Sequence, residues 1–378
     1  MTQAAATIFT IPNIPVDEEG YDNVNGDLIV SLNYIIQDPR GSKYQVTAKL
    51  GAGQFGQVFH VVDITNPTVQ PLPAYAMKVT KSIYRYRQQA QREVQLLTHV
   101  QSNTTPQEQQ HISHLQDWFL FHNHVCIVIE LLSFDLYEII KRRRFRGLPL
   151  VLVQSVLKDM LEVLNGLERC GIIHCDIKPE NILLADEYSQ SVKMIDFGSS
   201  NFSNQPGSFY VQSRYYRAPE VVLGINYSFP IDIWSLGCVA LELFTALPLF
   251  PGQNEVHLIE LIVEMLGQFP DSMVQASTRR QEFFLPDGTL KSEEQICREK
   301  HIPVTRFEKY FEYNTLDEVV LNYDLRRFNN NPELLRQELT KRQMFINLLK
   351  GMLRLDPAQR LTAAQALQDP FITADLTH

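Results

Sequence analysis

The segment IIHCDIKPENILL at residues 172–184 decides how this chain is interpreted, together with VKMIDFGSS at residues 192–200. The two segments place His174 and four further polar side chains at the spacing of a phosphoryl-transfer site: Asp176, Lys178, Asn181 and Asp196. At such a site Asp176 accepts the proton of a substrate hydroxyl, Lys178 neutralises charge on the transferred phosphoryl group, and the other two of the four hold magnesium. Surface loops use the same residue types, so this pattern requires a second, independent signal.

The second signal is a glycine-rich segment, KLGAGQFGQVF at residues 49–59. Its glycines, Gly51, Gly53 and Gly56, allow a strand-turn-strand to approach the phosphates of ATP without a Cβ in the way. A β-hairpin that needs positive φ angles explains the same glycines. A dinucleotide-binding turn is disfavoured because the residues after Gly56 continue as a β-branched strand, and a P-loop is excluded because no Gly-Lys-Ser/Thr follows.

A lysine and a glutamate are expected to form an ion pair. Lys78 lies in the apolar, strand-like segment YAMKV, and Glu93 lies in QQAQREVQLLTHV at residues 88–100. Four apolar residues of the second segment recur at roughly helical spacing: Ala90, Val94, Leu97 and Val100. This predicts a helix that presents Glu93 to Lys78, and the pair then directs the ammonium at the α- and β-phosphates. The alternatives are a strand-edge lysine whose charge reaches solvent and a solvated helical glutamate.

With these motifs in order, residues 44–371 resemble the eukaryotic protein kinases. Downstream markers agree: RAPE at residues 217–220, DIWSLGC at residues 232–238, and Arg360 in LDPAQR, which by resemblance pairs with Glu220. Lys178, two residues after Asp176, is the pattern of serine/threonine kinases. The resemblance therefore covers most of the chain and implies an active enzyme of this class.

The same resemblance implies an α+β, two-lobed organisation. Its parts are an N-terminal extension at 1–43, a strand-rich N-lobe at 44–131, a helical C-lobe at 132–371 and a tail at 372–378. The extension is expected to pack on the N-lobe through apolar side chains: Leu28, Ile29, Val30 and Leu32. The hinge is expected near Glu130–Ser133. The polar stretch at residues 277–307 is expected to lie in the insert typical of the CMGC group of kinases.

Finer resemblance narrows the branch. Cys175 stands where most kinases have arginine, and together with YVQSRYYRAPEVVLG at residues 210–224 it resembles the dual-specificity tyrosine-regulated kinases (DYRK). Residues 18–36 are similar to the acidic box that precedes the kinase domain in this branch, especially in its Yak-like members, and residues 345–373 agree. The Yak-like subfamily is the preferred assignment. The homeodomain-interacting kinases of the same branch are the nearest alternative.

Site residues are carried over from this resemblance. The implied catalytic residues are Asp176, Lys178, Lys78 and Glu93, and the implied magnesium ligands are Asn181 and Asp196. The implied ATP-binding residues are Gly51, Ala52, Gly53, Gly56, Val58, Ala76, Lys78, Ile129, Glu130, Leu132 and Leu183. A scaffold that keeps the fold without turnover is the alternative function, but Lys78, Asp176 and Asp196 are all intact, which disfavours it.

The branch also implies a substrate preference and an activation switch. The expected partners are proteins phosphorylated on serine or threonine, often followed by proline and with arginine upstream. Arg217 is expected to occupy a backbone carbonyl near the residue after the phosphoacceptor, which favours proline there. Tyr210 is expected to be phosphorylated by the kinase itself, and its phosphate would recruit Arg214 and Arg217. A packed, unmodified tyrosine is the alternative.

The chain departs from its branch at two of the positions that matter. Vertebrate members carry a Tyr-x-Tyr pair in the activation loop, whereas here Ser208 stands two residues before Tyr210. Ile129, expected to guard the back of the ATP pocket, is smaller than the phenylalanine common there. The inhibitor preferences of relatives are therefore not expected to transfer directly to this chain.

Composition bounds the remaining function classes. With 378 residues, 44% hydrophobic, a net charge of −9 and a pI near 5.6, the chain suits a catalytic domain of ordinary size and not a general nucleic-acid binder. Five scattered cysteines without metal-ligand spacing predict neither a zinc site nor a disulfide framework. No signal peptide or membrane span is expected, which favours the cytoplasm, the nucleus or both. The catalytic domain is expected to be monomeric. The basic cluster KRRRFR at residues 141–146 is interpreted as the solvated end of a helix begun at Phe134, with a nuclear signal or a substrate-docking patch as the alternatives.

Overall fold

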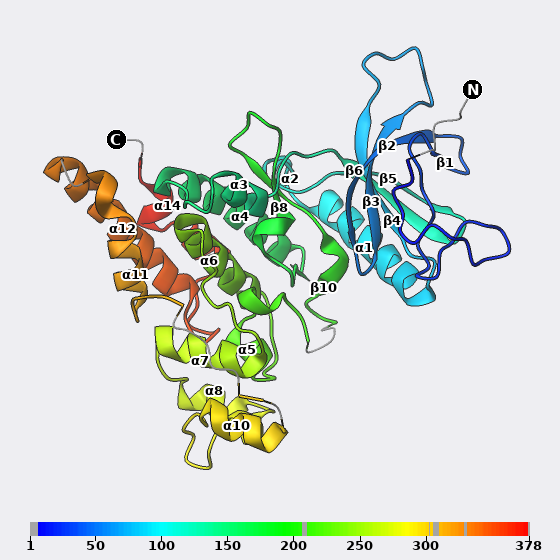
Figure 1. Cartoon of the computed structure of the whole chain (residues 1–378). Helices are drawn as coiled ribbons and strands as arrows, with labels where there is room; N and C mark the ends of the chain where they lie inside the picture. The colour runs from blue at the N-terminus through cyan, green and yellow to red at the C-terminus, as the bar shows by residue number, and fades with distance from the viewer. Residues whose placement is uncertain (1–6, 206–209, 302, 305–309, 329–330, 377–378) are drawn as a thin grey trace. The chain divides into compact units, whose positions relative to one another are not determined.

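The computed structural model describes residues 7–205, 210–301, 303–304, 310–328 and 331–376 (Figure 1). Ser208 and residues 302 and 305–307 of the predicted insert therefore lie outside the described residues. Backbone contacts divide the chain into two compact units, Met1–Ser133 (unit 1) and Phe134–His378 (unit 2). The division falls at the end of the segment predicted to be the hinge.

Unit 1 is built on a six-stranded antiparallel sheet with the strand order β1-β2-β3-β4-β6-β5. The strands are β1 (Ile35–Gln37), β2 (Lys43–Gly53), β3 (Gly56–Asp63), β4 (Ala74–Thr80), β5 (Leu115–Phe121) and β6 (His124–Glu130). The helices are α1 (Tyr84–Asn103) and α2 (Pro106–Gln109). β1 comes from the predicted N-terminal extension, so the extension contributes an edge strand as well as a covering segment.

The two faces of this sheet are covered by different parts of unit 1. α1 packs its buried Ala90 and Val94 against Val125 and Ile127 of β6. The opposite face packs against Leu28 and Val30 of the extension, which belong to one buried cluster with other sheet residues. The expectation for Leu32 was wrong: its side chain is 40% exposed, because Leu32 and Asn33 form a turn, with a φ of +64° at Asn33, where the strand-like alternation that buries Leu28 and Val30 ends.

Unit 2 is mainly helical (Figure 1). Its helices are α3 (Leu136–Arg142), α4 (Leu150–Arg169), α5 (Pro219–Val222), α6 (Pro230–Thr245), α7 (Glu255–Leu266), α8 (Asp271–Ala276), α9 (Arg280–Phe283), α10 (Glu293–Lys300), α11 (Leu316–Asn322), α12 (Pro332–Met352), α13 (Ala363–Ala366) and α14 (Pro370–Thr373). Short strands pair as β7 (Ile172–Ile173) with β10 (Asn201–Phe202) and as β8 (Ile182–Leu184) with β9 (Val192–Met194). Short 3₁₀ turns are η1 (Pro179–Asn181), η2 (Phe197–Ser199), η3 (Arg214–Tyr216) and η4 (Leu325–Phe328).

α6 is the core helix of unit 2, and α4 and α12 pack against it. All its residues from Ile231 to Thr245 are buried. Glu220, after the RAPE arginine, and Arg360 form the ion pair that resemblance implied, with Oε1 and Oε2 of the glutamate 2.6 and 2.9 Å from the guanidinium nitrogens. Both side chains are almost fully buried. This pair ties the segment before α6 to the segment after α12.

The sequence-based helix boundary at the basic cluster was wrong. α3 begins at Leu136, not at Phe134, because the Asp135 carboxylate caps the helix by accepting the backbone N–H of Glu138 at 2.7 Å. The helix ends at Arg142, so Arg143–Arg146 lie beyond it instead of forming its last turn.

All five cysteines are free thiols. Among the described residues, no helix is both long and apolar enough to cross a membrane.

Candidate active site

The predicted ion pair of unit 1 is present. The strand register places Val58, Lys78 and Ile127 opposite one another on three adjacent strands, so their side chains share one face of the sheet. α1 covers this face, and the Lys78 Nζ lies 2.9 and 2.8 Å from the two carboxylate oxygens of Glu93. The side chains are 17% and 6% exposed, which makes this a largely desolvated contact with a fixed geometry.

The glycine-rich segment forms the hairpin between β2 and β3, where Gly53 pairs with Gly56. Gly56 has a φ of +154°, and a Cβ there would lie 2.2 Å from the Val79 carbonyl oxygen, so the packing of β4 requires glycine. A Cβ at Gly51 or Gly53 would meet no atom within 4 Å. The hairpin alternative therefore accounts for Gly56, whereas protein packing does not explain the other two glycines.

The other predicted nucleotide-binding residues are distributed over both units. In unit 1, Ala76 pairs with Ile129 across β4 and β6, and Glu130 accepts the backbone N–H of His114 at 2.8 Å through its side chain. Ala52 lies in β2, and Leu132 follows β6 and is half-buried. Leu183 lies in β8 of unit 2, where it bridges to Asp135. Each of these contacts lies within a single unit.

In unit 2, the Asp176 carboxylate is held by three side chains. Its Oδ2 accepts hydrogen bonds from the Lys178 Nζ at 2.7 Å and from the Asn181 Nδ2 at 3.1 Å. Its Oδ1 accepts the Ser213 hydroxyl at 2.6 Å, and that hydroxyl also accepts from Lys178 at 3.2 Å. Ser213 was missed by the sequence reasoning. The signal that could have identified it is its position just before Arg214, in the YVQSRYYR segment that resembles the dual-specificity tyrosine-regulated kinases.

A buried carboxylate positions the catalytic segment. Asp232, at the start of α6, accepts the backbone N–H groups of His174 at 2.7 Å and Cys175 at 3.0 Å. Burial raises the pKa of Asp232, while these two donors favour its charged form. The backbone of Cys175 has a φ of +66°, a conformation that these bonds hold in place immediately before Asp176.

The two predicted metal ligands lie at one end of the β8–β9 ribbon. Ile182 pairs with Met194, and the Ile195 N–H donates to the Asn181 carbonyl at 3.0 Å, so Asn181 and Asp196 are one register step apart. The Asn181 Nδ2 donates to the Asp176 carbonyl at 2.8 Å. This hydrogen bond fixes the orientation of the side-chain amide and therefore the position of its oxygen. Asp196 has a φ of +60° and accepts the Gly198 N–H at 3.2 Å. One amide oxygen and one carboxylate suit a hard cation such as Mg²⁺.

Two arginines of the activation segment (residues 210–217), Arg214 and Arg217, lie around Tyr210. The Arg217 guanidinium lies over the Tyr210 ring, with the guanidinium carbon 4.1 Å from the ring centroid. Its hydrogen bond to the phenol oxygen lowers the pKa of Tyr210, and Arg214 acts in the same direction. The ring is 63% exposed. A ring in contact with Arg217 and a hydrogen-bonded hydroxyl are also what the alternative of a packed, unmodified tyrosine requires, so phosphorylation of Tyr210 stays a prediction.

Arg217 also binds the backbone just before it. Its Nε and Nη2 donate to the carbonyl oxygens of Val211 and Gln212, each at 2.9 Å, and its Nη1 lies 3.0 Å from the Glu255 carboxylate of α7. Gln212 has a φ of +67°, and its side chain donates to the Ser235 hydroxyl and the Ile231 carbonyl of α6. The expected engagement of backbone carbonyls by Arg217 is thus present.

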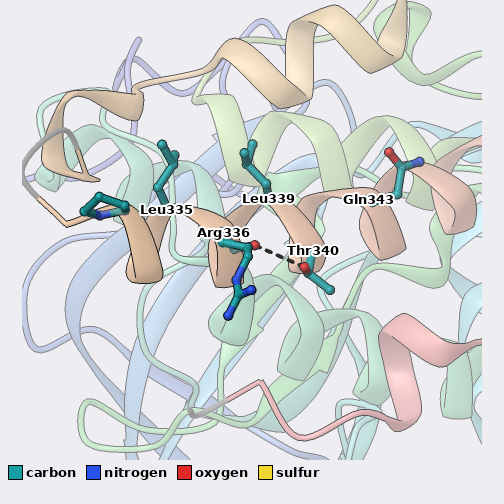
Figure 2. A pocket seen from close by; sticks show the side chains of 6 residues that line it. Leu335, Arg336, Leu339, Thr340 and Gln343 are labelled. Carbon is teal, nitrogen blue, oxygen red and sulfur yellow. Dashed lines mark hydrogen bonds between the residues drawn. The ribbon is translucent and has the colours of Figure 1, made fainter.

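An open depression of about 490 Å³ lies along α12 and contains none of the predicted site residues (Figure 2). Figure 2 shows Leu335, Leu339 and Gln343 projecting from one side of the helix and Arg336 and Thr340 from another, with the Thr340 hydroxyl bonded to the Arg336 carbonyl at 3.0 Å. No catalytic group is present there.

Comparison with known proteins agrees with this geometry. Residues 44–372 match the protein kinase domain. The chain is 40% identical to a serine/threonine-protein kinase, ppk15, of Schizosaccharomyces pombe, over 96% of this chain and 68% of that protein. It is 40% identical to a probable serine/threonine-protein kinase, yakA, of Dictyostelium discoideum, over 97% and 26% respectively.

A third relative is a dual specificity tyrosine-phosphorylation-regulated kinase 3 of Mus musculus, 37% identical over 94% of this chain and 57% of that protein. The chain thus spans less than two thirds of the length of two of these three relatives. The match to the kinase domain and these identities together show that the chain belongs to the protein kinase family, within the group of Yak-like and dual-specificity tyrosine-regulated kinases.

Proposed function

We propose that this protein transfers the γ-phosphoryl group of ATP to serine and threonine hydroxyls of protein substrates. The observation that carries the proposal is the arrangement around Asp176, whose carboxylate is oriented by Lys178, Asn181 and Ser213. A carboxylate held in this way accepts the proton of an attacking hydroxyl, and the adjacent ammonium offsets charge on the transferred group. Asp176 is the proposed base, and Lys178 is the proposed electrostatic stabiliser.

Unit 1 supplies the proposed contacts to the ATP phosphates. Glu93 fixes the Lys78 ammonium at the end of a desolvated ion pair, and this orientation suits the α- and β-phosphates. Gly51 and Gly53 leave open space beside the backbone, which lets its N–H groups approach the phosphates. The absence of any packing reason for these two glycines supports a role in ligand binding.

The proposed metal is Mg²⁺, held by Asn181 and Asp196. When bound, it neutralises charge on the phosphates during transfer. The protein contributes two oxygen ligands of defined orientation, because Asp176 fixes the amide of Asn181 and the turn at Gly198 fixes one oxygen of Asp196.

We also propose a preference for proline after the phosphoacceptor. Arg217 occupies the carbonyl oxygens of Val211 and Gln212, and the positive φ of Gln212 turns the backbone away from an extended conformation. A substrate N–H next to this segment would then lack an acceptor, and proline has no N–H to leave unpaired. Screening a serine peptide library should enrich proline at this position; no enrichment would remove the proposal.

The regulatory proposal is that the kinase phosphorylates its own Tyr210. Arg217 and Arg214 already lie around the phenol, so a phosphate there would replace a neutral hydroxyl between two cations with a dianion. These contacts would order the segment that contains Ser213, which binds Asp176.

The central experiment compares purified wild-type protein with Asp176→Asn, using radiolabelled ATP and a basic protein substrate. The variant should bind ATP and unfold at a similar temperature, but its turnover should fall by about three orders of magnitude because the proton acceptor is lost. A wild-type protein without turnover in this assay would support the scaffold alternative. A variant with near-wild-type turnover would show that Asp176 is not the base.

A further inference from the structure

The basic cluster at residues 141–146 is a charged feature of unit 2 that the proposed reaction does not use. Five of its six residues are basic in a chain whose net charge is −9, and all six are exposed. We define this surface as the α3 basic loop: Lys141, Arg142, Arg143, Arg144, Phe145 and Arg146. Two properties decide whether this surface can bind a partner: whether its charges are already paired within the protein, and whether its backbone is held in one conformation.

Only part of this charge is neutralised within the protein. Glu138 of α3 pairs with Lys141 at 3.3 Å and with Arg142 at 3.0 Å. Asp135, the other acid of this helix, is engaged as its N-cap. In the part of the chain that the structure describes, no carboxylate lies within 4.0 Å of the guanidinium of Arg143, Arg144 or Arg146. Arg143 donates to a neutral acceptor, the Gly147 carbonyl at 3.5 Å, so these last three arginines have no internal counter-charge among the described residues and can bind an external anion.

Backbone hydrogen bonds hold the loop in a defined conformation where it carries these arginines. Arg144 and Phe145 both have left-handed conformations, with φ of 58° and 54°, and their N–H groups donate to the carbonyls of Lys141 at 2.8 Å and Ile140 at 3.0 Å. Two successive non-glycine residues in this conformation are unfavourable and persist only where the surroundings hold them.

The far end of the loop is clamped to the core helix. A Cβ at Gly147 would lie 1.6 Å from the Phe244 carbonyl oxygen, so the backbone of the loop touches the end of α6 directly. The Gly147 N–H donates to the Tyr323 hydroxyl at 3.1 Å, and the Leu148 N–H donates to the Leu243 carbonyl at 2.7 Å. Because the frame is fixed, binding a partner costs little backbone ordering.

Exposed aromatic side chains accompany the charges. Phe145 is 56% exposed within the loop, and Tyr137, one turn before Lys141 on α3, is 43% exposed. Arginine and aromatic residues together are the composition enriched at protein-binding surfaces.

We propose that the α3 basic loop is a docking surface for an acidic segment of protein substrates, with carboxylates or phosphates on Arg143, Arg144 and Arg146 and an apolar side chain on Phe145. The proposal rests on the proposed kinase function. It adds a surface that selects substrates and that contains none of the proposed catalytic residues. Docking of this kind lowers the KM of a substrate that carries the acidic segment without changing the rate of the chemical step.

The test uses the full chain with the Asp176→Asn background, so that binding is measured whether or not the kinase proposal holds. Probes are short fluorescent peptides that contain one phenylalanine and are rich in glutamate, in phosphoserine or in glutamine. We expect the two acidic peptides to bind and the glutamine peptide not to bind. The variant Arg143→Gln/Arg144→Asn/Arg146→Gln, in which asparagine tolerates the left-handed backbone, should bind about tenfold more weakly.

A matched control removes three other exposed charges of unit 2, in Arg326→Gln/Arg336→Gln/Lys350→Gln. It changes net charge equally and should leave peptide affinity within about twofold of the parent. Equal losses in both triple variants would reduce the effect to net charge and overturn the proposal. Tighter binding of a DNA oligonucleotide or of phosphatidylserine vesicles than of the acidic peptides, lost in the loop variant, would assign the surface to another class of partner and also overturn it.

Discussion

The guanidinium carbon of Arg217 lies 4.1 Å from the ring centroid of Tyr210. The same guanidinium is held by the carbonyls of Val211 and Gln212 and by Glu255, so it is fixed before any phosphate is added. The phenol oxygen therefore already lies beside a preorganised cation, and this arrangement leads to the first prediction.

Wild-type protein expressed in a host with little tyrosine-kinase activity should carry phosphate on Tyr210, whereas the Asp176→Asn variant should not. Mass spectrometry of both proteins measures this directly. Tyr210→Phe should reduce turnover by about tenfold or more, because the anion that orders the segment cannot form. Fully active wild-type protein with unmodified Tyr210, or equal modification of the inactive variant, would contradict self-activation.

Lys78→Arg should lower turnover by about 100-fold while leaving the fold intact. Glu93 holds a compact ammonium at 2.8 and 2.9 Å, and a planar guanidinium cannot take the same place between this carboxylate and a phosphate. Steady-state kinetics with ATP as the varied substrate measures the effect. The control is Lys81→Arg, which changes a lysine next to β4 outside this pair and should retain near-wild-type activity.

Ser213→Ala should reduce kcat by about tenfold with a smaller effect on the KM for ATP. The Ser213 hydroxyl donates to the Asp176 Oδ1 at 2.6 Å and accepts from Lys178 at 3.2 Å, so its loss leaves both groups less well oriented. Ser213→Thr keeps the hydroxyl and should restore most of the rate. If threonine does not rescue the alanine defect, the hydroxyl is not the group that matters.

Glu242→Gln should change how stability depends on pH. Burial raises the pKa of Glu242 from 4.5 to about 7, and its Oε2 accepts the Tyr216 hydroxyl at 2.8 Å. Between these two pH values the folded state retains a proton that the unfolded state releases, so this group costs stability as the pH rises from 4.5 to 7. The glutamine variant keeps an acceptor for Tyr216 and avoids this loss.

Relative to wild type, the variant should therefore gain on the order of 1 to 3 kcal/mol in the free energy of unfolding between pH 5 and pH 8. Urea denaturation at both pH values measures the difference. Glu187→Gln, which removes an exposed glutamate of the same unit, controls for the change in net charge. An identical difference between Glu242→Gln and wild type at both pH values would show that Glu242 is not protonated in the folded state near neutral pH.

The amino-acid sequence by itself determined the fold class, the order of the catalytic segments and the ion pairs Lys78–Glu93 and Glu220–Arg360. The first pair was accessible because a strand pattern and a helix pattern with an apolar face each constrain where their side chains point. The second was accessible only through resemblance, because 140 residues separate its members and no periodicity connects them.

Only the tertiary structure decided which side chains complete the site. Ser213 reaches Asp176 across 37 residues, and Asp232 reaches the His174 N–H across 58, through contacts that depend on how α6 and the activation segment pack. It also decided that α3 ends before Arg143. The Asp135 carboxylate caps the first turn of the helix, and the contacts of Gly147 with α6 and Tyr323 fix the backbone that follows the helix. Local patterns determine which elements form, whereas the hydrogen bonds of buried polar groups depend on neighbours that only the packed chain brings together.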